Sequence, residues 1–371
     1  MVYKALRKAG LGGSVLKLAK PFIRTGGTLP GYAEAMETLT ALSPDPGSSC
    51  LRSAGGMCAD KFDLDIIIPA YNVENYIARC IDSALNQQCS YRFRLIIVDD
   101  GSTDSTGAII DRYAQDERLT IIHQENRGFS GARNRGLACS DAAYIMFLDS
   151  DDSLPAGALQ ALLSCAFENG AALVEGAYNT TDTEGRMLSS IAHKSGCLDC
   201  RNDFFGFTGM KIISAGLMKE LQFPEGYWYE DSIMAQIIYP LAERSGCKSY
   251  GISAPVYNYT INPKGISHSG RQSPKSIDSL WITMQLYKDR EKLGLEKDQK
   301  YYEYILRMIV LSYRRAENQS EETKRAMLVL WQDFLGRNMG GFESNDKNLK
   351  ILEQAVRAGN FRLYSAACRL I

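Results

Sequence analysis

From Phe62 to Asp149, apolar runs typical of strands alternate with amphipathic segments typical of helices. The strand-like runs are DLDIIIPA, FRLIIVDD, LTIIH and YIMFLD, and the segments between them place apolar residues at helical spacing. Strands joined by single helices form a parallel sheet through right-handed crossovers, and helices cover both of its faces. The alternation therefore predicts a Rossmann-like α/β/α sandwich, whose ligands bind beyond the carboxyl ends of the strands.

The later sequence extends this architecture less regularly. We expect a fifth strand over 172–176, a helix that begins near Asp231 and a strand over 250–259. Amphipathic helical patterns dominate from Ser276 onward and predict a C-terminal helical appendage. The expected division, ordered along the chain, is a basic N-terminal extension and linker, an α/β domain and a helical region, at 1–61, 62–270 and 271–371.

Composition restricts the partners. The 42 lysines and arginines nearly balance the 43 aspartates and glutamates, so no overall charge favours nucleic acid. No apolar run approaches the roughly 18 residues that a membrane-spanning helix needs. Ten cysteines in a long chain without a secretory leader predict reduced thiols and an intracellular protein. The single Cys197-Leu-Asp-Cys200 pair is more typical of a loop than of a zinc site.

The N-terminal segment carries its charge unevenly. Six lysines and arginines precede the first acid, Glu34, and leucines are interleaved with them. A basic amphipathic segment of this kind can lie on anionic lipid headgroups, which predicts peripheral membrane contact. The alternative, a solvated tail, is favoured by Gly10, Gly12, Gly13, Gly26 and Gly27 in the same segment. The sequence leaves both interpretations open.

Polar side chains follow the strand-like runs at the expected ligand edge. Asp99 and Asp100 follow the second run, and Asp149, Asp151 and Asp152 follow the fourth. Neighbouring carboxylates repel one another unless a cation neutralises them. Mn²⁺ and Mg²⁺ take one or two protein carboxylates and complete their shell with phosphate and water. We therefore expect a metal site at the fourth strand end, with an acidic loop facing water as the alternative.

Other motifs with similar residues fit less well. An EF-hand loop needs glycine and glutamate where this chain has Leu154 and Gln160. Neither a Walker loop nor GxGxxG follows the first strand. The string Asp-x-Asp-x-Ser-Leu also resembles the nucleophile loop of haloacid-dehalogenase-like phosphatases, but there the loop follows the opening strand. A phosphatase remains the alternative enzyme.

Five segments in one order carry a more specific resemblance. They are IIIPAYNVENYI, LIIVDDGSTD, ENRGFSGARNRGL, YIMFLDSDD and WYEDS, and together they resemble the family-two glycosyltransferases of the GT-A fold. The resemblance covers about residues 63 to 270. It implies an inverting, metal-dependent transferase that takes a nucleotide-diphospho-sugar, usually a uridine one. The implied acceptor is a growing polysaccharide or lipid-linked saccharide in the cytoplasm or at the cytoplasmic membrane face. A homologue that binds the donor without turnover is a third alternative.

The resemblance also implies roles for individual residues. Asp231 matches the general base, although a helix N-cap is its alternative role. Asp149 and Asp151 match the metal-binding carboxylates, and Asp100 matches the acceptor of the uracil N3 hydrogen. The loop at 262–269 resembles one that closes over the donor. The other implied contacts are Pro69, Ala70, Tyr71, Glu74, Asp99, Arg133 and Ser150 for the donor, Trp228 and Glu230 for the sugar or acceptor, and Lys264 or His268 for the diphosphate.

Overall fold

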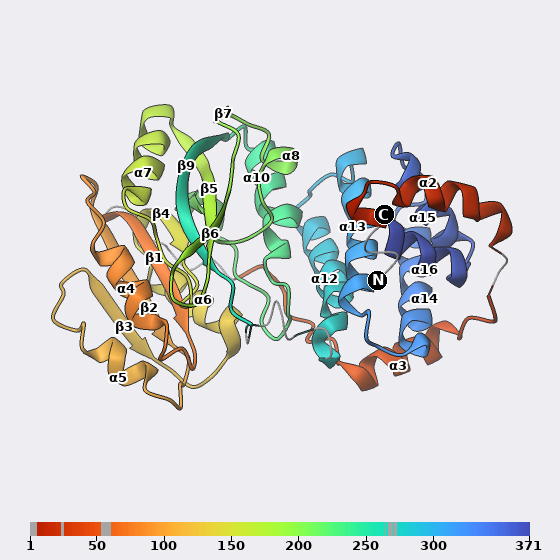
Figure 1. The fold of residues 1–371 in the computed structure, drawn as a ribbon, viewed down its shortest axis with the longest axis horizontal. Coiled ribbons are helices and arrows are strands. Elements are labelled where there is room, and N and C mark those ends of the chain that lie inside the picture. The colour runs from red at the N-terminus through yellow and green to blue at the C-terminus, as the bar shows by residue number, and fades with distance from the viewer. Residues whose placement is uncertain (1–5, 24–25, 53–60, 264, 266–269, 271–272) are drawn as a thin grey trace. The chain divides into compact units, whose positions relative to one another are not determined.

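We describe a computed structural model of the chain, shown in Figure 1. The described residues are 6–23, 26–52, 61–263, 265, 270 and 273–371. They form two compact units built from interleaved stretches of sequence. The α/β unit comprises Ser48–Gly226 and Glu230–Pro263, and the helical unit comprises Met1–Gly47, Tyr227–Tyr229 and Lys264–Ile371.

Nine strands of the described chain form one sheet in the α/β unit, in the order β3-β2-β1-β4-β8-β5-β9-β7, with β6 paired to β5. The first four strands are parallel, as the alternating pattern predicted. β8 runs antiparallel to both β4 and β5, whereas β9 is parallel to β5. The strands are β1 Phe62–Ala70, β2 Phe93–Asp99, β3 Leu119–His123, β4 Ala142–Phe147, β5 Ala171–Thr181, β6 Met187–Ile191, β7 Gly196–Cys197, β8 Lys211–Ser214 and β9 Lys248–Thr260.

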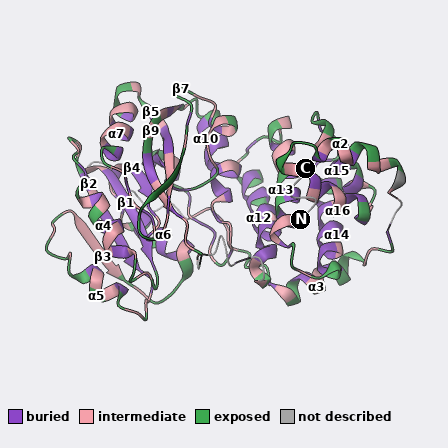
Figure 2. Ribbon diagram, viewed as in Figure 1, coloured by how far each residue is buried: buried purple, intermediate pink, exposed green. Residues whose placement is uncertain are grey.

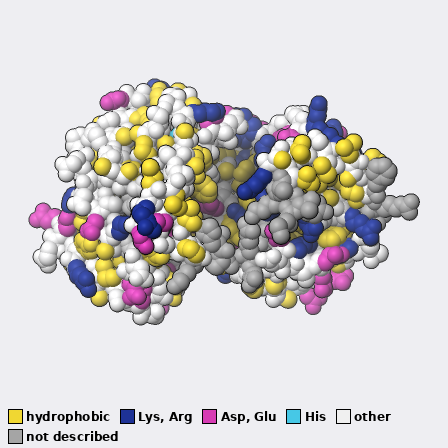
Figure 3. All heavy atoms as spheres, viewed as in Figure 1, with side chains coloured by type: hydrophobic (Ala, Val, Ile, Leu, Met, Phe, Trp, Pro, Cys, Tyr) yellow, Lys and Arg dark blue, Asp and Glu magenta, His cyan; other side chains and the backbone are white. Residues whose placement is uncertain are grey.

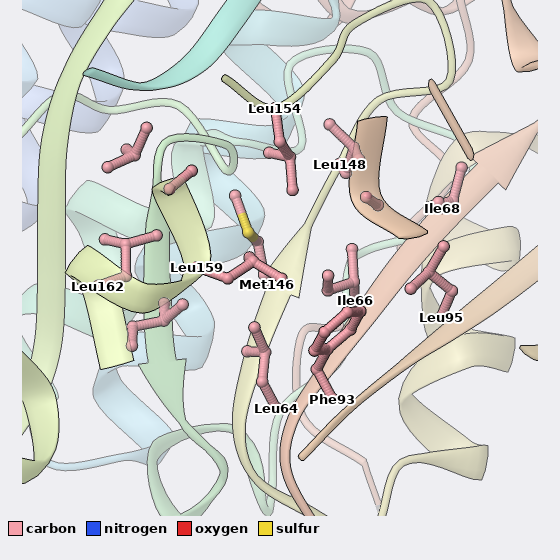
Figure 4. Packing of buried hydrophobic residues seen from close by; sticks show 14 of the residues in the cluster. Leu64, Ile66, Ile68, Phe93, Leu95, Met146, Leu148, Leu154, Leu159 and Leu162 are labelled. Atoms are coloured by element: carbon pink, nitrogen blue, oxygen red, sulfur yellow. The ribbon is translucent and has the colours of Figure 1, made fainter. Parts of the chain in front are cut away.

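Helices cover both faces of this sheet, and alternate strand residues serve the two sides. Ile66 and Ile68 of β1 belong to the apolar cluster that also includes residues of α4 and α7, shown in part in Figure 4. Ile67 faces α6, where Gly136 allows close approach because a Cβ there would lie 2.4 Å from the Ile67 side chain. The helices of this unit are α4 Ile77–Leu85, α5 Thr106–Asp111, α6 Gly128–Cys139, α7 Ala158–Asn169, α8 Cys200–Asp203, α9 Ala215–Met218, the π-helix η2 Met234–Ile238 and α10 Tyr239–Arg244.

The structure confirms the α/β/α sandwich and adds features that the pattern did not predict. Most residues of the central strands β1, β2 and β4 are buried, as Figure 2 shows, which explains their continuous apolar runs. β5 and β9 extend several residues beyond the expected 172–176 and 250–259. The antiparallel β8 and the short strands β6 and β7 were not expected, so the second half of the sheet is mixed rather than parallel.

The helical unit joins the two ends of the chain. α3 packs on α14, and α2 packs on α16. This part of the N-terminal segment is therefore folded rather than a solvated tail. No helix in the described part of the chain is long and apolar enough to span a membrane. The division at residues 61 and 270 stays a prediction. The helices are α2 Gly12–Ala19, η1 Lys20–Phe22, α3 Tyr32–Leu42, η4 Pro274–Ile277, α12 Asp278–Lys292, α13 Gln299–Arg315, α14 Glu321–Asn338, α15 Lys347–Arg357 and α16 Phe361–Leu370.

Candidate active site

The acidic loop after β4 is held firmly by β9. The Asp149 backbone N–H donates to the Tyr257 hydroxyl at 3.2 Å, and the Thr260 N–H donates to the Asp152 carboxylate at 2.7 Å. The Asp152 side chain is buried, and this burial, with the charges of its acidic neighbours, raises its pKa well above the ordinary value. Asp152 is thus an internal anchor of the loop, which leaves two carboxylates of the string to face a ligand.

Those two carboxylates suit a divalent cation. Asp149 keeps 41% of its side chain exposed, while Ser150 beside it is buried. Burial and the Asp149 charge raise the pKa of Asp151, which accepts a hydrogen bond from Asn262 Nδ2 at 3.3 Å. A cation would relieve this repulsion, and carboxylate oxygens are the ligands that Mn²⁺ and Mg²⁺ prefer. No group of three or more acids, histidines or cysteines among the described residues can hold a metal alone, so phosphate or water would complete its shell.

A buried arginine links this loop to the segment of the predicted base. Arg133 of α6 is 6% exposed, donates to the Asp149 carboxylate at 2.7 Å and donates to the Glu230 carboxylate through its other terminal nitrogen. Burial raises the pKa of Glu230 to about 7, with the Asp231 charge adding to this shift and Arg133 opposing it. The nucleotide contact predicted for Arg133 stays a prediction, but its place between two carboxylates makes it a bridge within the site.

Asp231 lies three residues before the first residue of a π-helix. Its backbone carbonyl accepts from the Met234 N–H at 2.9 Å, at the start of the π-helix η2. π-Helical turns are rare and occur frequently at functional sites. Tyr229, two residues earlier, adopts a φ of +67°, which is uncommon for an aromatic residue. Unlike the buried Glu230, Asp231 is only partly buried.

Asp100, the residue predicted to accept the uracil N3 hydrogen, uses only one of its two carboxylate oxygens in hydrogen bonds to the described residues. Asp100 is 2% exposed, and its Oδ1 accepts from Gln124 Nε2 at 2.7 Å and from the Arg127 N–H at 2.9 Å. Its Oδ2 is buried and has no hydrogen-bond partner among the described residues. Buried acceptors in folded proteins almost always have donors, so an unpaired carboxylate oxygen suggests a ligand N–H.

Two further residues that are predicted to bind the nucleotide-sugar, Asp99 and Glu74, support the loop after β2. Asp99 pairs with His123 Nδ1 at 2.8 Å and accepts from the Ser102 N–H at 3.1 Å. Glu74 accepts from the Ser105 N–H at 3.0 Å. Both carboxylates therefore hold the backbone of this loop, and their contact with the nucleotide-sugar stays a prediction.

The remaining predicted residues divide between the two units. Pro69 and Ala70 are buried at the end of β1, and the Tyr71 side chain after them is exposed. Trp228 belongs to the helical unit, where its backbone N–H donates to Asp278 at 3.0 Å. Two predicted residues lie outside the described part of the chain, namely Lys264 and His268.

An arginine that sequence reasoning missed holds the acidic loop after β4. The Nη2 of Arg79, on α4, donates to the Asp151 carbonyl at 3.1 Å and to Thr260 Oγ1 at 3.0 Å. Its Nη1 donates to the Thr183 carbonyl at 2.8 Å, in the segment between β5 and β6. Arg79 thereby fixes the backbone of a predicted metal ligand against β9 and the segment between β5 and β6.

Replacing this arginine should weaken the cation site. We expect Arg79→Met to raise the Mn²⁺ concentration needed for half-maximal activity by about 10- to 100-fold, because the hydrogen bond from Arg79 orients Asp151, a predicted metal ligand. Titration of activity with Mn²⁺ measures the shift. The matched control is Arg92→Met, which removes a largely exposed arginine from the same unit. Equal Mn²⁺ requirements in both folded variants would contradict the role.

A buried charge cluster lies in the second half of the sheet. Lys211 of β8 forms an ion pair with Glu175 of β5, and both side chains are fully buried. Lys211 also donates to the Phe205 and Phe207 carbonyls at 2.9 and 2.6 Å and to the Tyr239 hydroxyl at 3.0 Å. The cluster therefore joins two strands to the loop before β8 and to the helix that follows Asp231.

His193 adds a titratable group to this cluster. Its Nε2 faces the Glu175 carboxylate at 2.8 Å, and its Nδ1 faces the Lys194 carbonyl at 2.7 Å. Both partners are acceptors, so the doubly protonated ring satisfies both contacts. The hydrogen bond to Glu175 is the main cause that raises the His193 pKa, against the opposing effects of burial and of the Lys211 charge.

Folding stability should therefore fall as His193 loses its proton. A histidine with a raised pKa in the folded state contributes stability that is fully present below its unfolded pKa of about 6.5. This contribution disappears as the pH rises through the folded pKa. We expect the melting temperature of the native protein to fall more between about pH 6 and about pH 9 than that of His193→Gln. Identical pH slopes in thermal melts would show that His193 carries no such linkage.

Comparisons with known proteins identify the family of this chain. The family model described as glycosyl transferase family 2 matches residues 65–217. An uncharacterized glycosyltransferase of Haemophilus influenzae is 32% identical over 246 residues, which cover 64% of this chain and 93% of that protein. Glycosyltransferase GlyA of Streptococcus pneumoniae is 30% identical over 223 residues, which cover 55% of this chain. This chain spans only 31% of the length of GlyA.

The solved structures agree on the fold. TarS of S. aureus, crystallised with UDP-GlcNAc, superposes with a TM-score of 0.64 at 20% identity, covering 82% of this chain and 89% of that chain. The half-parallel sheet with acidic loops at its carboxyl edge is the GT-A fold of nucleotide-sugar transferases. The chain belongs to glycosyltransferase family 2. This membership confirms the resemblance of the five segments and sets the phosphatase alternative aside.

Proposed function

We propose that the protein is an inverting, metal-dependent glycosyltransferase that moves a hexosyl or N-acetylhexosaminyl group from a UDP-sugar to an acceptor hydroxyl. The acceptor in this proposal is a growing polysaccharide or a lipid-linked saccharide in the cytoplasm or at the cytoplasmic membrane face. One observation carries the proposal: Arg133 joins Asp149 to Glu230, the neighbour of Asp231, at the carboxyl edge of the sheet. This arginine supports the proposal because it links a predicted metal-binding carboxylate to the segment that carries the predicted base.

The unpaired carboxylate oxygen of Asp100 supports a uridine nucleotide as the sugar donor. The N3–H of uracil would meet this buried carboxylate oxygen in a charge-assisted hydrogen bond, whereas cytosine has no N3–H to offer. TarS, which shares this fold, was crystallised with UDP-GlcNAc. Both observations support a uridine donor held with its base beside Asp100 and its diphosphate toward Asp149 and Asp151.

The metal role rests on Asp149 and Asp151. When bound, Mn²⁺ or Mg²⁺ supplies positive charge that stabilises the departing diphosphate. Arg79 and Asn262 hold Asp151 in place for this task, and Arg133 holds Asp149. The exposed part of the Asp149 carboxylate remains available to the ligand.

Asp231 would act as the general base. It takes the acceptor hydroxyl proton while that oxygen attacks the anomeric carbon opposite the diphosphate, so a single displacement inverts the configuration. Glu230 suits this role less, because it is buried against Arg133. In the proposal Glu230 instead positions the base segment, and Trp228 contacts the sugar or acceptor.

Release of UDP tests the proposal. Incubation with a set of UDP-hexoses and UDP-N-acetylhexosamines should release UDP when Mn²⁺ or Mg²⁺ and a saccharide acceptor are present. Chelation with EDTA should stop the release. Donor binding with no turnover or donor hydrolysis would favour a non-catalytic homologue. Cleavage of simple phosphomonoesters that ends with Asp149→Asn would overturn the transferase assignment.

A further inference from the structure

The helix α2 has two apolar faces. One of them packs against the rest of the helical unit, and the other is exposed. Leu16 is fully buried, and a Cβ at Gly12 would lie 2.0 Å from the Leu370 carbonyl oxygen, so this face packs closely on the end of α16. Leu11 and Leu18 are 52% and 76% exposed. Leu11 is the N-cap residue of α2 and has helical backbone angles, and Leu18 follows seven residues later, so two helical turns place both on the same outward face. Figure 3 shows hydrophobic side chains on the surface where α2 lies.

The charge around this apolar stripe has one sign. Residues 6–23 contain four cations and no acid. Lys8 and Lys17 are exposed beside the stripe, and Lys20 donates to Gln354 Oε1 at 2.5 Å. An exposed leucine pair flanked by lysines is the pattern of a helix that lies in a membrane interface.

Three more cations gather beside Tyr313 in the same unit. Lys324 Nζ lies 5.8 Å and Arg369 Cζ 5.9 Å from the centre of its ring, and Arg314 Nε donates to a backbone carbonyl of α16 at 2.9 Å. Besides burial, the charge of Arg7 lowers the pKa of Arg314, and the charge of Arg369 lowers that of Lys324. These cations therefore repel one another, although the Glu317 charge acts against this effect at both Arg314 and Lys324. Lys324 is buried, so the partly exposed Arg7 and Arg369 are the members of this group that an anionic surface can meet.

We propose that α2 docks on an anionic lipid bilayer, with Leu11 and Leu18 at the headgroup boundary and the surrounding lysines and arginines against lipid phosphates. A second copy of the chain fits this face less well, because a two-fold contact would bring the like-charged surfaces together. The docking needs no sugar transfer, so it stands or falls separately from the proposed function.

Vesicle flotation of the full chain tests the proposal. We expect binding to vesicles of phosphatidylcholine mixed with phosphatidylglycerol, weak binding to phosphatidylcholine alone, and loss of binding at high salt. Lys8→Gln and Lys17→Gln should each weaken binding roughly fivefold. The double variant Leu11→Gln with Leu18→Gln should weaken it at least about tenfold. The matched control is Met187→Gln with Leu188→Gln, which changes two residues of the α/β unit with 68% and 56% exposure.

The possible results distinguish membrane docking by α2 from its alternatives. Loss of binding in the α2 variants, with the control pair unchanged and melting temperatures preserved, supports the proposal. No binding to anionic vesicles at low salt overturns it, and so does equal binding by the α2 variants. A dimer in analytical ultracentrifugation that disappears with the leucine substitutions would instead assign the stripe to a second copy. UDP release in solution should be the same for the α2 variants and the native protein.

Discussion

Asp231→Asn should lower kcat for sugar transfer by about 10²- to 10⁴-fold while donor binding stays unchanged. Asparagine keeps the size of the side chain and removes the ability to accept the acceptor proton. The donor does not need this carboxylate, because Asp100 is the proposed base contact and Asp149 and Asp151 are the proposed diphosphate site. The loss should therefore fall on the chemical step alone.

Two measurements separate this outcome from a general defect. Calorimetric titration with UDP and Mn²⁺ gives donor affinity, and UDP release with acceptor present gives kcat. Asp182→Asn, in the exposed turn between β5 and β6, is the matched control and should leave both unchanged. A variant at Asp231 with full activity, or with donor affinity lost in step with activity, would show that Asp231 is not the base.

Lys211→Met should reduce the free energy of unfolding by about 3–5 kcal/mol, because it leaves the Glu175 carboxylate buried without its cation. The variant also removes the donor to the Phe205 and Phe207 carbonyls. Methionine has a similar length, so the effect comes from charge and hydrogen bonding rather than from a cavity.

Urea unfolding of the variants measures this cost. Adding Glu175→Gln to Lys211→Met should restore a large part of the stability, because glutamine removes the unpaired charge and keeps an acceptor for His193 and the Phe205 N–H. Lys61→Met, whose side chain is 80% exposed, is the control and should change stability little. Equal stabilities of Lys211→Met and Lys61→Met would contradict the role of the buried pair.

The sequence predicted the first half of the sheet because each of its strands is a continuous apolar run between helical segments. β8 could not be predicted in the same way. It has four residues, begins with Lys211, and takes its antiparallel direction from strands more than thirty residues away in sequence. A charged residue such as Lys211 at the start of a strand predicts a surface position. Its burial is explained only by the ion pair with Glu175, which the sequence does not indicate.

In the candidate site, too, the sequence indicated some residues and gave no signal for others. The order of the motifs alone indicated the carboxylates Asp100, Asp149 and Asp231, which lie on three separate segments of the chain. Arg79 has no local signal, because its partner Thr183 lies 104 residues away. The bridging role of Arg133 was also hidden, since one of its carboxylate partners comes from a segment 97 residues later. Contacts that depend on tertiary folding therefore complete a site whose acids the sequence already indicated.

Calorimetric titration of UDP in the presence of Mn²⁺ tests the central claim most directly. The native protein should bind UDP with Mn²⁺ present and lose this binding in EDTA. Asp151→Asn should bind no UDP under either condition, whereas Asp116→Asn, which changes a surface partner of Arg118, should bind as the native protein does. UDP affinity that is the same with Mn²⁺ and with EDTA, and the same in Asp151→Asn, would contradict a metal-anchored donor at the end of β4.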